Sequence, residues 1–194
     1  GISMEKKSAI STRKIVFTAL MAALTIVGSA LRITIPVDIA GTTSFHLGNI
    51  MCALGGILLG PWYGGLSAAL GSAIYDMMNP LYISEAWITF LMKGIYGLLP
   101  GLIIRFGKKD AGYVKALLGS AAGAVAYALL YLLKSYIKGI YVKGWEPSAA
   151  MLDVVGKLPA TVFNAVVAIV FAPILFLAIR KALARNHLRI DAGQ

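Results

Sequence analysis

The chain has 194 residues, of which 59% are hydrophobic and only 13% are charged, with a formal net charge of +10. Soluble domains carry about 25% charged residues, and the mean hydropathy of +0.80 is high for such a domain. These values predict a polytopic, all-α integral membrane protein. The absence of ~10-residue segments of alternating hydropathy argues against a transmembrane β-barrel. Because the basic residues cluster at the ends of apolar runs, we expect the lipid bilayer rather than a nucleic acid as partner.

The apolar runs predict one membrane domain over residues 1–194. Six transmembrane helices fit this length, and we expect them at about residues 15–31, 46–60, 62–79, 86–106, 112–135 and 152–179. The region from 46 to 79 is too long for one crossing, and its sequence GPWYGG (60–65) predicts a tight turn between two short spans. Residues 32–45 are rich in β-branched residues and predict a structured extracellular loop, which would act as a lid with Gly41 as its hinge.

The distribution of Lys and Arg predicts the orientation. Most of them lie at the N-terminus, in the loop after the fourth span and in the C-terminal tail, which share one side of a six-span protein. The positive-inside rule then places both termini in the cytoplasm.

Small residues recur four positions apart in several predicted spans, and for Gly119 and Gly123 in the fifth we expect packing within the protein's own bundle. Ala19 and Ala23 lie in the first span, and Gly65, Ala69 and Ala73 lie in the third. Such stripes let helices approach closely in lipid, where no hydrophobic force drives their association. The stripes of the first and third spans serve either packing within the protein's own bundle or docking of a partner, and composition leaves the two interpretations open.

Motifs for enzymatic chemistry are missing from the sequence. It contains no P-loop, no G-x-S-x-G elbow and no H-E-x-x-H zinc site. We therefore expect no enzyme, no catalytic residue, no metal and no cofactor. An autonomous ion-driven carrier is one function class that stays open, although Asp76, near a span end, is a poor solitary coupling site.

Several polar or aromatic residues in the outer halves of the spans are candidates for binding a substrate. Lys93 lies seven residues into the fourth span, about 10 Å below its outer end, where it either snorkels or faces a cavity. His46 and Asn49, three residues apart, share one face of the second span. His46 and Trp87 have interfacial alternatives, and Trp87 would otherwise stack on an aromatic ligand.

The last two spans add a second group of candidates. Lys157, Thr161 and Asn164 share one face of the sixth span, and Tyr127 and Tyr131 form a stripe on the fifth. Asn164 has the alternative of bonding a neighbouring helix, and Tyr131 that of marking the interface. Together these residues suit a small polar heteroaromatic or carboxylated compound, and two inward-facing lysines would favour an acidic or phosphate-bearing one.

Four segments carry a resemblance to a known family. They are STRKIVFTALMAAL (11–24), FHLGNIMCALGGILLGPWYGGLSAALGSAIYD (45–76), ITFLMKGIYGLLPGLI (88–103) and LPATVFNAVVA (158–168). In this order they resemble the S components of energy-coupling factor (ECF) transporters, most closely the branch with riboflavin-type and hydroxymethylpyrimidine-type members.

This resemblance implies a substrate-binding subunit of a vitamin importer in the bacterial plasma membrane. It implies six helices with cytoplasmic termini and one vitamin-sized ligand near the outer face. Pyrimidine- or pyridine-type compounds are favoured, followed by riboflavin or pantothenate. The resemblance further implies docking on a transmembrane coupling subunit with two ATPase subunits, through an Ala-x-x-x-Ala motif matched by Ala19 and Ala23. Asn164 matches an asparagine that the family points at its substrate.

Overall fold

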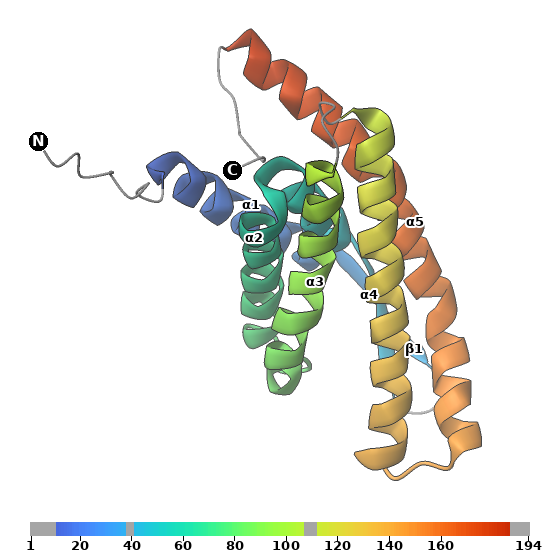
Figure 1. Ribbon diagram of the computed structural model, residues 1–194. Helices are drawn as coiled ribbons and strands as arrows, with labels where there is room; N and C mark the ends of the chain where they lie inside the picture. The colour runs from blue at the N-terminus through green and yellow to red at the C-terminus, as the bar shows by residue number, and fades with distance from the viewer. Residues whose placement is uncertain (1–10, 38–40, 107–111, 187–194) are drawn as a thin grey trace, which may run out of the picture.

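The computed structural model describes residues 11–37, 41–106 and 112–186, which form long helices and one β-hairpin (Figure 1). In chain order the elements are α1 (Thr12–Ala30), β1 (Arg32–Val37), β2 (Gly41–His46), α2 (Gly48–Met77), the 3-10 turn η1 (Ile83–Glu85), α3 (Ala86–Arg105), α4 (Tyr113–Tyr141) and α5 (Pro147–Arg185). Within the described residues, five helices are long and apolar enough to cross a membrane. The chain is therefore an all-α membrane protein with a small extended insertion.

Helix α2 is broken at one residue and folds back on itself there. Gly60 has a φ of +81°, a conformation that glycine adopts without steric cost, and Pro61 opens the second half with a φ suited to a first helical turn. The two halves lie side by side, with the Cys52 sulfur 3.7 Å from the Ser72 hydroxyl. The predicted turn over 60–65 is thus shorter than expected, because the residues after Gly60 are already helical.

The small residues in the second half of α2 pack inside the bundle. Gly65, Ala69 and Ala73 are all buried, with Ala69 only 2% exposed. A methyl group on Gly65 would lie 3.1 Å from the carbonyl oxygen of Gly94 on α3, so the two helices are in close contact. The prediction that these three residues form a docking surface is therefore wrong, because α2 and α3 use small residues to pack against each other.

The first helix presents a different surface. Its residues Met21, Ala22 and Thr25 are buried, and Ala22 and Thr25 lie against Gly71 of α2. Ala19 and Ala23 lie on another side of α1, and both are exposed. The small residues of α1 are thus divided between an internal contact and an outer face.

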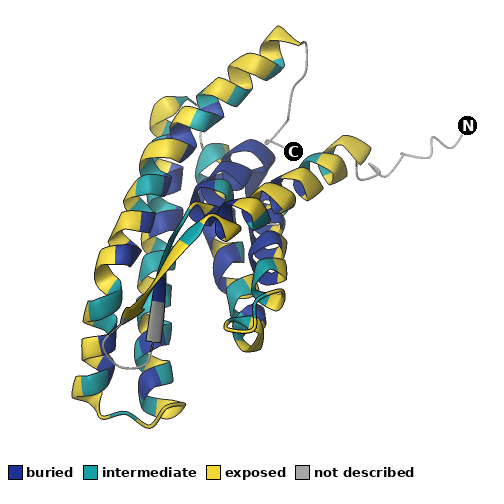
Figure 2. Cartoon of the chain, turned by 180° about the vertical axis from the view of Figure 1, so that it is seen from behind, coloured by how far each residue is buried: buried dark blue, intermediate teal, exposed yellow. Residues whose placement is uncertain are grey.

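The helices form two groups with the hairpin beside them (Figures 1 and 2). The broken helix α2 packs against α1 and α3 and is the most buried helix, as Figure 2 shows by its dark colour, while α4 and α5 pair with each other. The hairpin pairs Arg32 with His46 at its base, and β2 packs against α5. The predicted loop over 32–45 is therefore an ordered hairpin in its described part, with Gly41 inside β2 rather than in a separate hinge.

The last two helices are longer than the apolar runs alone predict. Helix α4 continues to Tyr141, and α5 covers 147–185 and stays helical through Pro159 and Pro173. At 1.5 Å per residue, the 39 residues of α5 span about 58 Å, whereas the apolar core of a bilayer is about 30 Å thick. The predicted bounds were too short because hydropathy marks only the lipid-facing part of a helix.

Candidate functional site

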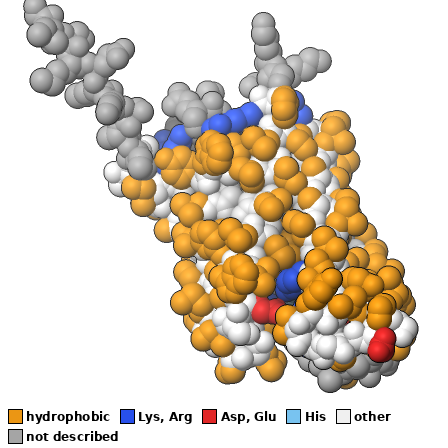
Figure 3. Space-filling view, turned by 60° about the horizontal axis from the view of Figure 1, so that its bottom comes forward, with side chains coloured by type: hydrophobic (Ala, Val, Ile, Leu, Met, Phe, Trp, Pro, Cys, Tyr) orange, Lys and Arg blue, Asp and Glu red, His pale blue; other side chains and the backbone are white. Residues whose placement is uncertain are grey.

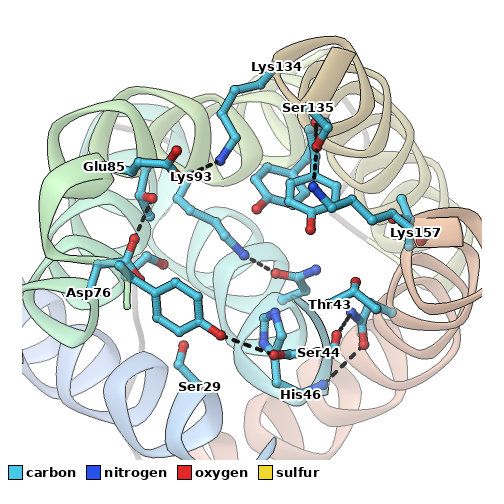
Figure 4. Close-up of a pocket in the computed structure, with 18 of the residues that line it drawn as sticks. Ser29, Thr43, Ser44, His46, Asp76, Glu85, Lys93, Lys134, Ser135 and Lys157 are labelled. Carbon is cyan, nitrogen blue, oxygen red and sulfur yellow. Dashed lines mark hydrogen bonds and ion pairs between the residues drawn. The ribbon is translucent and has the colours of Figure 1, made fainter. Parts of the chain in front are cut away.

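A cavity of about 510 Å³ lies where the hairpin meets the helices. Helices α1 to α5 all contribute residues to its wall, together with β1, β2 and η1. Figure 4 looks into this cavity and shows charged and hydroxyl side chains pointing inward from several elements. Its volume lies in the ~300–1,000 Å³ range of small-molecule sites.

A buried ammonium group stands in the cavity wall. Lys93 on α3 is 4% exposed, and its Nζ donates a hydrogen bond to Oδ1 of Asn49 on α2, which is 3% exposed. The same Nζ lies 4.2 Å from the ring centre of Tyr127 and 5.6 Å from that of Tyr96. Lys93 therefore points into the protein and does not snorkel toward the lipid surface.

Helix α4 supplies an aromatic wall. The rings of Tyr127 and Tyr131 are nearly parallel, at 18°, with their centres 6.1 Å apart. Lys157 on α5 lies beyond them, with its Nζ 5.9 Å from the centre of the Tyr131 ring. The Lys157 ammonium forms an ion pair of 3.0 Å with the buried carboxylate of Asp153, so its charge is compensated within α5.

Arg32 also lines the cavity, and sequence reasoning missed it. Its Nε donates to the backbone oxygen of Ser29 at 2.6 Å, and its guanidinium lies 4.3 Å from the ring centre of Tyr75 and 5.1 Å from that of Tyr82. The Tyr82 hydroxyl is in turn 3.3 Å from the hydroxyl of Ser44. One signal pointed to Arg32, because it is a basic residue in the loop predicted to lie on the side opposite the basic clusters.

Asn164 on α5 fastens the hairpin to the bundle. Its Oδ1 accepts a hydrogen bond of 3.1 Å from the backbone N–H of His46, and its Nδ2 donates one of 2.7 Å to the backbone oxygen of Ser44. The rings of Phe45 and Phe163 meet edge to face beside it, with centres 5.1 Å apart. The side-chain amide of Asn164 thus pairs with β2 as a peptide group would.

His46 is held at the junction of β2 and α2. Its Nδ1 accepts a hydrogen bond of 3.2 Å from the backbone N–H of Gly48, so the neutral ring carries its proton on Nε2. Burial, followed by the positive charges of Lys93 and Arg32, lowers the pKa of His46 well below its usual value. The imidazole is therefore neutral at physiological pH.

Two acidic residues face the cavity as well. Asp76 on α2 accepts a hydrogen bond from the Thr89 hydroxyl of α3. Glu85 pairs with Lys134, at 3.3 Å, and with Lys138, so it joins η1 to α4. In Figure 3, basic and acidic side chains meet in a hollow between apolar side chains, and further Lys and Arg side chains line the upper edge of the molecule. The cavity is thus a charged site inside an apolar envelope.

The structure brings nearly all of the predicted site residues together. Those in the cavity wall are His46, Asn49, Lys93, Tyr127, Tyr131, Lys157 and Asn164. Trp87 is the exception, since it is 66% exposed on the outside of α3, and its predicted place in the site is wrong. Six residues separate it from Lys93, which puts the two side chains about 120° apart around the helix. Thr89, four residues before Lys93, faces the cavity instead.

The family of the chain follows from its sequence as a whole. A family model described as "ECF-type riboflavin transporter, S component" matches residues 9–181. The chain belongs to the S components of ECF transporters. S components are membrane-embedded transporter subunits rather than enzymes, and they bind vitamin-type substrates and partner with a coupling subunit and ATPases. The resemblance seen in the sequence is thereby confirmed at the level of the family.

The chain is also similar to individual proteins. The S component is 33% identical over 115 residues to an uncharacterized protein of Pyrococcus woesei, which covers 59% of this chain and 72% of the relative. It is 27% identical over 177 residues to a UPF0397 protein of Streptococcus gordonii, covering 90% and 91% of the two chains. A solved structure of the S component of a bacterial ECF transporter aligns with a TM-score of 0.62 at 16% identity, over 91% of this chain and 98% of that one. At this identity the structural likeness shows the shared fold alone.

Proposed function

We propose that this S component binds a water-soluble vitamin or vitamin precursor in the cavity between the hairpin and the helices. A coupling subunit powered by two separate ATPases would then complete the import. The observation that carries the proposal is the cavity of about 510 Å³, in which the buried Lys93–Asn49 pair faces the aromatic wall of Tyr127 and Tyr131. A pyrimidine- or pyridine-type compound suits these groups best, followed by riboflavin or pantothenate.

We further propose that α2 crosses the membrane twice, which gives six spans. The break at Gly60 and the contact between Cys52 and Ser72 support this topology, because they make the two halves of α2 antiparallel neighbours. With six spans, the basic ends of α1 and α5 lie on the cytoplasmic side of the plasma membrane. The cavity then opens toward the outside, with the hairpin as its lid.

The proposed docking surface for the coupling subunit is the outer face of α1. Ala19 and Ala23 are both exposed there, four residues apart, and a small-residue pair at this spacing permits close approach of a partner helix. The stripe on α2 is buried and takes no part in this surface. The coupling subunit would therefore contact α1 first.

Transport by reconstituted protein tests the importer function. The purified chain is placed in liposomes alone, and in parallel together with the coupling subunit and both ATPases, with ATP inside or withheld. We expect substrate accumulation only in the complete complex with ATP. Accumulation by the chain alone, driven by an ion gradient, would instead identify an autonomous carrier.

Ligand binding tests the site independently of transport. Candidate vitamins are titrated against the purified protein and against Lys93→Met and Tyr127→Leu, because these residues form the centre of the cavity. Lys181→Met, on the exposed end of α5, is the matched control. We expect both cavity variants to lose affinity at least about tenfold, which is the effect of one lost charge-assisted or stacking contact. Unchanged affinity in both would remove the cavity as the binding site.

A further inference from the structure

The charges around the cavity are unevenly compensated. Three of its outer cations are paired with acids: Lys134 and Lys138 share Glu85, and Lys157 is bound by Asp153, while Lys143 lies over the ring of Trp145. These contacts account for the basic residues of α4 and α5 that lie closest to carboxylates. They leave a second, inner set of charges to be explained.

The inner set contains two cations and one acid. Arg32 and Lys93 line the cavity together with Asp76, and neither cation forms an ion pair within the part of the chain that the structure describes. Asp76 instead accepts a hydrogen bond from Thr89. The inner set therefore has an excess of one positive charge.

Aromatic contacts do not replace a counter-charge for these groups. Lys93 lies over the ring of Tyr127, at 4.2 Å, but its only hydrogen-bond acceptor among the described residues is the neutral oxygen of Asn49. A cation–π contact contributes less free energy than an ammonium loses when it leaves water. A buried lysine in a membrane protein is therefore costly unless it faces a partner, such as a bound ligand.

Arg32 is held in an orientation that suits recognition of an anion. The rings of Tyr75 and Tyr82 flank its guanidinium, and Nε is fixed by the backbone oxygen of Ser29. Its Nη1 also donates to the Ser44 hydroxyl at 3.4 Å, and these two bonds use two of the five N–H groups of the fork. A guanidinium that is already positioned loses little entropy when it binds a carboxylate or a phosphate.

From this arrangement we infer that the substrate carries a negative charge, as a carboxylate or a phosphate, which is bound by Arg32 and Lys93. The inference rests on the proposed function and narrows its substrate class. The tyrosines on both walls then contact the apolar or aromatic part of the same molecule. Asp76 limits the preference to ligands with few negative charges, because it adds a like charge to the site.

The inference is tested with matched pairs of compounds that differ in one charged group. The pairs are nicotinamide and nicotinate, pantothenol and pantothenate, pyridoxine and its 5′-phosphate, and riboflavin and its 5′-phosphate. Binding is measured by titration of purified protein at constant ionic strength. We expect the anionic member of at least one pair to bind tighter by about tenfold or more, as one charge-assisted contact provides. The pairs also separate carboxylate from phosphate recognition.

Variants assign the preference to the two cations. Arg32→Gln and Lys93→Gln each remove a positive charge, and we expect both to reduce the anionic-to-neutral affinity ratio at least about tenfold. Lys181→Gln, at the exposed end of α5, should leave the ratio unchanged. Should Lys93→Gln fail to fold, Arg32→Gln still decides, because Arg32 lies in the hairpin outside the helices.

Three results would overturn the inference. They are equal or tighter binding of the neutral member in every pair, no binding by any pair, and a preference that survives both substitutions. Failure of the proposed function would be detected by separate measurements, namely complex assembly and ATP-dependent transport. A chain that assembles with the coupling subunit and imports a neutral vitamin would keep the function and remove the anionic substrate.

Discussion

The ammonium of Lys93 on α3 and the side-chain oxygen of Asn49 on α2 form a hydrogen bond inside the protein, and both residues are buried. Asn49→Leu leaves the buried ammonium without this acceptor, and we expect a loss of unfolding free energy of about 2 kcal/mol. Lys93→Met combined with Asn49→Leu removes both polar groups, so the double variant should be more stable than the sum of the single changes predicts.

The measurement is unfolding of the ligand-free protein in detergent, analysed as a double-mutant cycle. Asn186→Leu is the control, because Asn186 is exposed at the end of α5. Additive effects of the two cavity substitutions would show that Lys93 and Asn49 do not depend on each other.

The hairpin should be more mobile when the hydrogen bonds from the side chain of Asn164 are removed. Asn164→Ala deletes the hydrogen bonds to His46 and Ser44, which join the side chain of α5 to the backbone of β2. We expect the amides of residues 41–46 to exchange with deuterium about five- to tenfold faster, the effect of roughly 1 kcal/mol. Substrate should also dissociate faster.

Hydrogen-exchange mass spectrometry of the purified protein provides the readout. Thr161→Ala is the matched control, since Thr161 lies on the same face of α5 but bonds only the backbone of Lys157 in its own helix. Unchanged protection of β2 in Asn164→Ala would mean that other contacts hold the hairpin.

Bulky substitutions should affect the buried small residues of α2 and the exposed small residues of α1 differently. Ala69→Trp forces a large ring into the contact between α2 and α3, where the residue is 2% exposed, so we expect loss of folded protein. Ala23→Trp places the same ring on the exposed side of α1, so folding and ligand binding should persist while assembly with the coupling subunit weakens.

Size-exclusion chromatography reports folding of each variant, and co-purification with a tagged coupling subunit reports assembly. Leu133→Trp is the control, because Leu133 is exposed and belongs to α4 rather than to α1. Full assembly of both Ala19→Trp and Ala23→Trp would remove α1 as the docking surface.

The free energy of unfolding should decrease as the pH decreases, over a range set by the pKa of His46. Because its pKa in the folded protein is lowered below the usual ~6.5, the unfolded chain takes up a proton first as the pH falls. We therefore expect a loss of stability from about pH 6.5 downward, until the lowered folded-state pKa is reached. Protonation would also break the hydrogen bond from Gly48 to Nδ1.

Thermal unfolding between pH 7.5 and 5.5 checks this expectation. His46→Gln should reduce the pH dependence, whereas His187→Gln should preserve it and serve as the control. Equal slopes for the wild type and His46→Gln would show that His46 does not set this window.

Composition and spacing predicted the membrane class and seven residues of the cavity wall. The i, i+3 and i, i+4 spacings were sufficient for Asn49, Tyr127, Tyr131 and Asn164, because a helix converts such spacing into a common face. Trp87 was misplaced because an aromatic residue at the outer end of a span can lie on the outside of the helix as readily as in a ligand site, and only the fold shows which.

Two further features depended on tertiary contacts that spacing does not encode. The small stripe of Gly65, Ala69 and Ala73 would look the same whether it faced α3 or a partner protein, and only the fold shows that α3 covers it. Arg32 gained its role from the ring contacts with Tyr75 and Tyr82, more than forty residues further along the chain. Long-range partners of this kind are invisible in a single sequence.

Ser29, at the end of α1, and Asn164, in the middle of α5, border the same cavity. During synthesis the proposed binding site therefore stays incomplete until α5 has entered the bilayer. A ligand added during translation would be captured only by chains in which α5 is already inserted.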